Sequence, residues 1–222
     1  MAPRLGGTFH RMMKILSSHS AVDRAKAAPR SPRMPVPGRA CGSCTLCCTT
    51  IAVEELSKPA GVRCGHALGC RGCAIYQLRP ASCRAFYCEW MLSNVLGREW
   101  KPDRAKFALM VTATGHLAVC VDPGFPSAWR RPSYYRTLQR WAHERAGDPW
   151  SRWPGVDVWI GRRCIIILPD GEHDLGIVTP REEVRIERRA APDGAAAYLA
   201  EKFNARPNPL ASSFGNAAPD TK

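Results

Sequence analysis

The run Cys41-Gly42-Ser43-Cys44-Thr45-Leu46-Cys47-Cys48 opens the stretch that decides how this 222-residue chain folds. Nine of the eleven cysteines lie between residues 41 and 88, and this run is the densest part. A core can replace a buried thiol with Ala or Val, so cysteine at this density indicates sulfur chemistry rather than packing. Two kinds of chemistry compete, disulfide bonds and metal thiolates.

The spacing within the run favours metal. Two residues separate Cys41 from Cys44 and Cys44 from Cys47, as in thiolate sites for zinc and for iron–sulfur clusters. In a helix of about 3.6 residues per turn, the four cysteines would project within an arc of about 120°, and a short turn would also let them face one side. The adjacent pair Cys47–Cys48 suits two neighbouring metals better than one tetrahedral zinc.

The cysteine total and the N-terminal sequence both argue against disulfides. Residues 1–40 are rich in Arg and Lys and lack the apolar centre of a secretory signal. Without export the chain stays in the cytoplasm, where thiols are kept reduced. An odd total of eleven also leaves at least one cysteine unpaired in any all-disulfide scheme. No run of about 18 apolar residues is present, so we expect no membrane span.

The net charge of +13 raises the question of nucleic-acid binding. Residues 1–40 carry +7 of this charge, and the rest of the chain carries +6. Thiolate ligands would offset much of the second part, and no surface that alternates aromatic and basic residues is evident. The sequence therefore argues against nucleic acid as the partner.

Composition shifts divide the chain into four segments. We expect a disordered basic tail over 1–39, a cysteine-cluster metal-binding module over 40–100, a small α+β unit over 101–204 and a disordered tail over 205–222. The predicted fold class is α+β, with the module joined to a small antiparallel β-sheet that carries one or two helices. The module has few large apolar residues, so bound metal would supply much of its folding free energy.

Hydrophobic periodicity and turn residues give the expected elements. Strands are predicted over 106–112, 116–121, 157–160, 163–168, 175–178 and 184–187. Helices are predicted over 81–92, 133–145 with Ser133 as N-cap, and 195–203. On the first helix, Cys83 and Cys88 would lie about 140° apart, so they would serve different ions unless the helix bends or ends between them.

The quoted run forms part of a larger pattern. It is followed by Lys58-Pro59-Ala60-Gly61-Val62-Arg63-Cys64, and then by residues 73–90, which read CAIYQLRPASCRAFYCEW. Over residues 41–90 the chain resembles the CxxCxxCC cysteine-cluster proteins, also called the YkgJ family and described as zinc- or iron-chelating domains. The resemblance implies a metal site but no particular biochemical activity. Some flagellin lysine methylases carry a similar cluster, which keeps an iron–sulfur interpretation open.

The resemblance also implies which cysteines are ligands. The eight positions that match the family pattern are Cys41, Cys44, Cys47, Cys48, Cys64, Cys73, Cys83 and Cys88. Cys70 is an extra thiol, and ligand and spectator roles are equally compatible with it. His66 could replace a thiolate on zinc, although a lone loop histidine is more often exposed. Cys120 and Cys164 lie in apolar strand-like runs, so we expect them to be buried hydrophobes.

Other residues of the stretch have less specific roles. Arg79 and Arg84 could hydrogen-bond thiolate sulfurs, or they could lie on the surface. The aromatic residues are expected to pack over the site; they are Tyr76, Phe86, Tyr87 and Trp90.

The function predicted is therefore metal binding, of zinc or iron, by clustered thiolates. No catalytic residues are evident, and a non-enzymatic role is favoured. The alternative is an iron–sulfur redox protein, or an accessory subunit of a radical or methyl-transfer enzyme. Eight thiolates would serve two zinc ions, one cluster and one zinc, or two clusters, and a protein partner is compatible with each.

Overall fold

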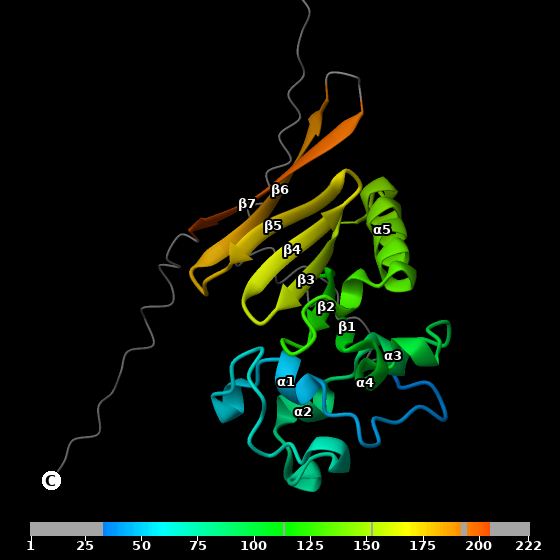
Figure 1. Ribbon diagram of the computed structural model, residues 1–222, viewed down its shortest axis with the longest axis vertical. Coiled ribbons are helices and arrows are strands. Elements are labelled where there is room, and N and C mark those ends of the chain that lie inside the picture. The colour runs from blue at the N-terminus through cyan, green and yellow to red at the C-terminus, as the bar shows by residue number, and fades with distance from the viewer. Residues whose placement is uncertain (1–32, 113, 152, 192–194, 205–222) are drawn as a thin grey trace, which may run out of the picture.

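The computed structural model describes residues 33–112, 114–151, 153–191 and 195–204 of this chain (Figure 1). The predicted disorder of residues 1–32 and 205–222 falls outside the described residues. Residues 33–39, which we assigned to the basic tail, lie against the module. The Val36 amide donates to the Met91 carbonyl at 2.8 Å, and the Arg39 guanidinium donates to the Leu96 carbonyl at 2.7 Å.

The cysteine-rich part is built from short helical turns. In chain order these are α1 (Cys47–Thr50), η2 (Glu54–Leu56), η3 (Gly69–Arg71), η4 (Tyr76–Leu78), α2 (Ala81–Ala85), α3 (Glu89–Leu92), η5 (Arg98–Trp100) and α4 (Pro102–Ala105). Isolated bridges join Val53 to Lys58 and Ala67 to Cys73. The single helix predicted over 81–92 is wrong, because the chain becomes extended at Phe86 and restarts as α3 after Cys88.

The second part carries a five-stranded sheet in the order β1-β2-β3-β4-β5. Its strands are β1 (Phe107–Val111), β2 (Leu117–Val121), β3 (Val156–Ile160), β4 (Arg163–Leu168) and β5 (Gly171–Ile177). The five strands predicted for this part are all present, although β5 begins at Gly171 rather than Leu175. Apolar runs with several β-branched residues explain β3 and β4 most directly. The sheet is mixed rather than antiparallel, since β2 and β3 run parallel.

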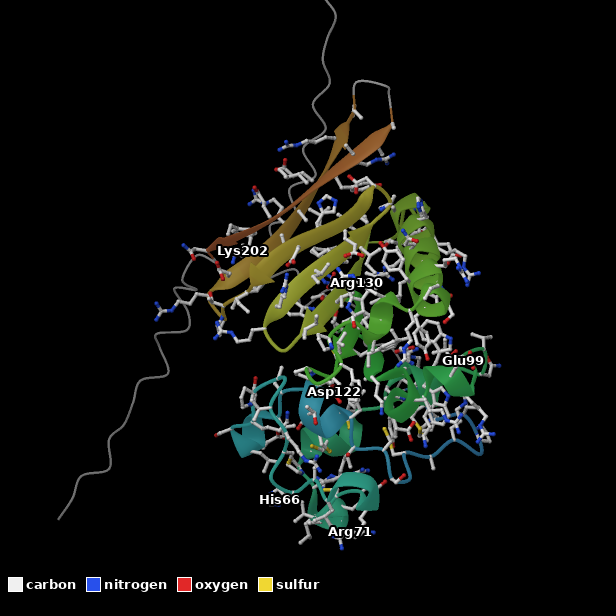
Figure 2. The ribbon with its side chains drawn as sticks, in the orientation of Figure 1. His66, Arg71, Glu99, Asp122, Arg130 and Lys202 are labelled. Atoms are coloured by element: carbon white, nitrogen blue, oxygen red, sulfur yellow. The ribbon has the colours of Figure 1, made fainter. Side chains whose placement is uncertain are left out.

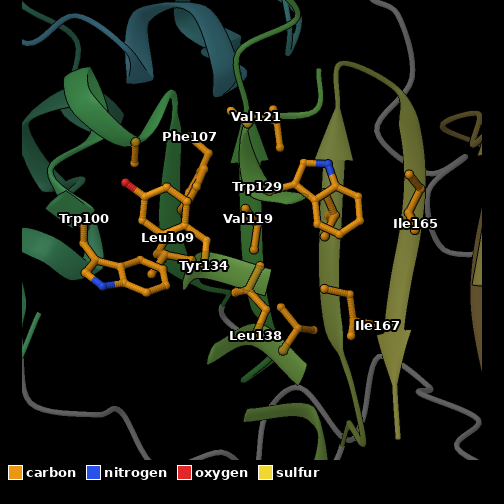
Figure 3. Packing of buried hydrophobic residues seen from close by; sticks show 14 of the residues in the cluster. Trp100, Phe107, Leu109, Val119, Val121, Trp129, Tyr134, Leu138, Ile165 and Ile167 are labelled. Carbon is orange, nitrogen blue, oxygen red and sulfur yellow. The ribbon is translucent and has the colours of Figure 1, made fainter. Parts of the chain in front are cut away.

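The parallel pair requires a long crossover, and this connection carries η6 (Ala128–Arg130) and α5 (Pro132–Gly147). Helix α5 was predicted, but its first residue is Pro132, and the residue before it, Arg131, makes no side-chain cap, so the N-cap role of Ser133 is wrong. Leu138 of α5 is fully buried on the face of the sheet that holds Val119 and Ile167. Figure 3 shows these side chains packed with Phe107 and Trp129 into one core.

On the opposite face, a two-stranded hairpin, β6 (Glu182–Ala190) and β7 (Ala196–Asn204), packs over β4 and β5 (Figure 1). The helix predicted over 195–203 is wrong, because this segment pairs with β6 along its whole length. Tyr198 of β7 packs with Cys164 and Ile166 of β4 in a second cluster.

The cysteine-rich part lies at the β1 end of the sheet (Figure 1). Ala108 of β1 packs with Leu46 and Met91. The two parts also come close together at Gly61 and at Gly161 of the β3–β4 turn. A Cβ at residue 61 would lie 2.7 Å from the Gly161 Cα. Both residues have positive φ, 79° and 60°, so glycine suits this contact on steric and conformational grounds. The described elements are thus α+β, as predicted.

No helix among the described residues combines the length and the apolar character that a membrane crossing requires.

Candidate functional site

All eight cysteines of the predicted set line one cavity of about 280 Å³. They are Cys41, Cys44, Cys47, Cys48, Cys64, Cys73, Cys83 and Cys88. Apolar side chains complete much of the wall, among them Ile51, Val53 and Phe86. Figure 2 shows the side chains of this region, with His66 and Arg71 labelled at the end remote from the sheet. Segments up to 47 residues apart in sequence therefore bring their thiols to one place.

The first cysteines reach the cavity through a turn that leads into α1. The Cys44 amide donates to the Cys41 carbonyl at 3.0 Å, which closes the turn. Helix α1 begins at Cys47, and Cys48 follows on the same short element. The Cys64 amide donates to the Cys48 carbonyl at 2.8 Å, so the next segment is fastened directly to α1.

The remaining cysteines arrive on a loop and two short helices. Cys73 pairs with Ala67, whose amide donates to the Cys64 carbonyl at 3.0 Å, and this places residue 73 beside the Cys64 turn. Cys83 lies in α2, and Cys88 is the N-cap of α3. The break between α2 and α3 removes the angular conflict expected for a continuous helix, because each cysteine now belongs to its own turn.

One set of thiols is embedded in apolar side chains. Cys41, Cys44 and Cys88 pack against the cluster that contains Leu46 and Met91. Burial raises the pKa of Cys88 to about 11, although the backbone at Met91 acts in the opposite direction. The Met91 amide donates to the Cys88 carbonyl at 2.8 Å. Burial also raises the pKa of Cys44, against a hydrogen bond from the Leu46 amide. The neighbouring backbone thus partly offsets the effect of burial on the pKa of Cys44 and of Cys88.

A second set of thiols lies near a buried lysine. The Cys47 thiol donates a hydrogen bond to the Cys48 sulfur, and this, with the charge of Lys58, lowers the pKa of Cys48 to about 6 despite burial. The same hydrogen bond, together with burial, raises the pKa of Cys47. Burial raises the pKa of Cys83, with the sulfurs of Cys48 and Cys64 adding to the effect.

Sequence reasoning gave Lys58 no role. Only 7 % of this residue is exposed, although lysine is rarely buried unless it is paired. Its ammonium donates to the carbonyls of Pro59 and Val62 at 3.0 Å each and of Thr49 at 3.4 Å. Burial lowers the pKa of Lys58, and the neighbouring sulfurs, Cys64 first, oppose that shift. A lysine between Ser57 and Pro59 reads as an exposed loop residue, so its sequence context offers no reason to expect it beside the thiols.

The other candidates differ in their position relative to the cavity. His66 is exposed at the edge of the cavity. Arg79 lines the cavity with its guanidinium 4.0 Å from the Tyr76 ring centre, whereas Arg84 is exposed. Cys70 belongs to η3, but the position of its side chain falls outside the described residues.

Of the four aromatic residues expected over the site, Tyr76, Phe86 and Trp90 line the cavity. Tyr87 packs instead against the cluster that contains Leu46.

Cys120 and Cys164 are buried in the sheet, as predicted, with 8 % and 1 % of each residue exposed. The Cys120 thiol lies 3.7 Å from the Met110 sulfur. Burial raises the pKa of Cys120 to about 12 and raises that of Cys164 as well. These two thiols lie outside the lining of the cavity.

The eight thiols line one cavity, but their sulfur atoms do not surround a common point at which a metal ion could bind. Within the described part of the chain, no group of three or more His, Cys, Asp or Glu side chains is arranged so that it could hold a metal ion. The cysteines therefore share a wall, while their sulfurs as placed do not make a coordination shell.

Comparison with known proteins adds no relative: no family model, no curated protein and no solved structure matches this chain.

Proposed function

We propose that residues 41–88 form a metal-binding site in which clustered cysteine thiolates hold zinc or iron. The observation that carries the proposal is that the eight cysteines of the predicted set all line one cavity. Disulfide pairing is not favoured, because the cysteines described are free thiols. Soft thiolate donors at this density select zinc, copper(I) or iron–sulfur clusters over hard cations.

The donor set fits such a group in chemistry, although the sulfurs, as placed in the described part of the chain, make no coordination shell, and binding would require cysteines to change rotamer. Cysteine has one χ angle, and a change between its staggered wells moves the sulfur by about 3 Å. The backbone at Leu46 favours the thiolate form of Cys44, and the backbone at Met91 favours that of Cys88. Hydrogen bonds from amides to sulfur are a common outer contact of thiolate centres, because they stabilise the anionic form.

The role we propose first is structural. Helices α1, α2 and α3 have four, five and four residues, far below the length at which a helix is stable alone. A four-thiolate zinc site is closed to substrate and contributes its binding free energy to folding. The bound metal would hold these turns in one arrangement against β1.

The second candidate function is electron transfer by an iron–sulfur protein, or an accessory role beside a redox enzyme. The volume of the cavity favours it, because about 280 Å³ is large for thiolates that close on a bare ion at about 2.3 Å. When bound, such a cluster would supply one-electron chemistry. The surrounding chain would tune it through burial and through the backbone beside Cys44 and Cys88.

Anaerobic purification followed by elemental analysis and an absorption spectrum tests both candidates. We expect about one or two zinc ions per chain, since four thiolates serve each ion; iron with acid-labile sulfide and a brown colour would select the second candidate. The matched control is the double variant Cys120→Ala with Cys164→Ala, which removes two thiols outside the cavity and should keep the full metal content. Wild-type protein that is folded throughout and free of metal would overturn the proposal.

A further inference from the structure

A second cavity, of about 520 Å³, lies beside the cavity of the thiols. Residues 38–39 contribute to its lining, together with the loop that leads from α3 through η5 to α4. Glu99 of η5, labelled in Figure 2, marks this region. None of the cysteines in the described part of the chain lines it. A cavity of this size accommodates a small molecule.

Positive charge prevails in this second cavity, which we call the basic cavity. The carboxylate of Asp103 belongs to the lining, and that of Glu99 lies beside the lining residue Gly97. Four cationic side chains outnumber these two acids. A concave surface with one prevailing sign of charge concentrates counter-ions, so the cavity favours an anion. The four cations are Arg39, Arg98, Lys101 and Arg104.

Two of these cations are available to a ligand. Arg98 and Arg104 are exposed, and within the described chain their side chains take part in no hydrogen bond or ion pair. The planar guanidinium group donates two parallel hydrogen bonds to the oxygens of a phosphate or a carboxylate. Two guanidinium groups in one cavity suit a phosphate monoester, which carries nearly two negative charges at neutral pH, better than a carboxylate with one.

Trp90 forms the wall between the two cavities, because it lines both. The Arg39 Cζ lies 4.8 Å from the centre of its ring, and the Lys101 Nζ lies 5.7 Å from it. Arg39 also donates to the Trp90 carbonyl and, at 2.7 Å, to the Leu96 carbonyl. The indole is therefore held between two cations that belong to the basic cavity.

Two polar atoms in these walls are buried and have no hydrogen-bond partner among the described residues, Trp90 Nε1 and Asp103 Oδ1. The other carboxylate oxygen, Asp103 Oδ2, lies 3.2 Å from the Lys101 ammonium. Buried polar groups are normally paired, so the wall offers one donor and one acceptor to a ligand. A hydroxyl group both donates and accepts, and it therefore complements both atoms.

We infer that the basic cavity binds a small phosphate monoester that also carries hydroxyl groups, such as a phosphorylated sugar or polyol. Arg98 and Arg104 bind the phosphate, and Asp103 accepts a hydrogen bond from a hydroxyl group. This site does not use the thiols, so the inference does not depend on the proposed metal-binding function.

Isothermal titration calorimetry of the full chain, purified without oxygen, tests the inference with four probes. These are ribose 5-phosphate, glycerol 3-phosphate, inorganic phosphate and ribose. We expect at least one of the two monoesters to bind about tenfold or more tightly than inorganic phosphate, as one hydrogen bond to a charged group allows, and ribose to show no binding. If neither monoester bound, or if inorganic phosphate bound as tightly as both, the inference would be wrong.

The double variant Arg98→Gln with Arg104→Gln tests the phosphate contacts. We expect the affinity for the monoester to fall by about 10- to 100-fold, because hydrogen bonds between charged groups are lost. The matched control is Arg162→Gln with Arg188→Gln, which removes two exposed arginines of the sheet part that lie outside the lining. Its affinity should stay within about twofold of the wild type, since these charges are screened by salt at a distance. An equal loss in both double variants would reduce the effect to net charge and overturn the site.

Asp103→Ala tests the hydroxyl contact through a change of sign. Removal of this carboxylate takes a negative charge away from the bound anion, so inorganic phosphate should bind at least as tightly as before. The monoester loses the acceptor of its hydroxyl group, and its preference over inorganic phosphate should fall by about tenfold. Asp103→Asn serves as a second variant in case the alanine variant does not fold, with a smaller fall in the same direction. An unchanged preference would show that Asp103 contacts no hydroxyl group and would overturn the assigned ligand class.

Discussion

The two parts of this molecule keep their shape by different means. In the sheet part, large side chains such as Phe107, Trp129 and Leu138 are fully buried between the sheet and α5 (Figure 3). Among the described residues, every large side chain that is fully buried lies beyond residue 106. The cysteine-rich part buries residues such as Leu46 and Met91 less completely, with 8 % and 4 % exposed.

Backbone hydrogen bonding shows the same contrast. The sheet has continuous ladders, whereas the cysteine-rich part is linked by local turns and by isolated contacts such as Cys64 to Cys48. Turns of three to five residues are unstable alone, because each costs chain entropy that few hydrogen bonds offset. The comparison indicates that the first part needs cross-links in place of a core, and its clustered thiols are the groups that could provide them.

Metal removal should separate the two parts most sharply. Treating the anaerobically purified chain with excess EDTA should expose the amides of residues 44–91 to exchange and leave those of β2, β3 and β4 protected. We expect exchange in the first part to rise by several orders of magnitude, since structural zinc contributes roughly 10 kcal/mol or more in small zinc domains. Hydrogen exchange read by mass spectrometry measures both regions in one sample.

Adding back zinc in excess of the chelator is the control, and it should restore protection in residues 44–91. If EDTA left the exchange of both parts unchanged, or opened both equally, the contrast between a cross-linked part and a cored part would be wrong.

A substitution in the hydrophobic core should destabilise the sheet part and not the cysteine-rich part. Leu138→Ala removes a side chain with no exposed surface, and we expect a loss of about 2–5 kcal/mol in the free energy of unfolding of the sheet part. Metal content should stay unchanged. Urea unfolding followed by tryptophan fluorescence measures the loss. Leu78→Ala is the matched control, because Leu78 is 83 % exposed and its loss should change stability by less than about 0.5 kcal/mol.

The elements that the sequence predicts well are those whose side chains decide the outcome locally. The runs at Cys164–Leu168 and Leu117–Val121 are β-branched and apolar, and they form central strands. The helix from Pro132 has an apolar stripe that includes Tyr134 and Leu138. The parallel pairing of β2 with β3 could not be read in this way, because a connection from residue 122 to 155 allows either direction.

Tertiary context overrode local preference in two places. The segment Ala196–Asn204 is rich in helix formers, yet it forms β7 because β6 offers it a full ladder and β4 a surface for Tyr198. The helix expected over 81–92 ends at Ala85, and its extended residues 86–88 direct Phe86 and Cys88 toward the cavity.

For the candidate site, spacing pointed to the run Cys41–Cys48 and the resemblance added the other four thiols, but neither indicated their neighbours. The two-residue gaps indicate that the thiols of Cys41, Cys44 and Cys47 can approach one another. They carry no information on Lys58, which depends on the path of the loop from Thr49 to Val62. A contact made through backbone carbonyls leaves no pattern of side-chain types to recognise.

The smallest expected effect distinguishes a thiol buried in the hydrophobic core, that of Cys120, from the thiols proposed as metal ligands. Cys120 is buried in β2 with its pKa raised to about 12 by burial, whereas an unfolded thiol has a pKa of about 8.5–9. Between these values the folded state retains a proton that the unfolded state has lost, so the stability contributed by Cys120 is complete below about pH 9 and falls as pH rises toward 12. At pH 10 we expect a loss of about 1 kcal/mol relative to pH 8.

Urea unfolding of the wild-type chain and of Cys120→Ala at both pH values isolates this thiol, because every other group titrates in both proteins. The variant should lose about 1 kcal/mol less than the wild type over this range. Equal losses would mean that the Cys120 thiol ionises as freely in the sheet as in water, and that its sulfur is not held in the core in the way that separates it from the thiols of the cavity.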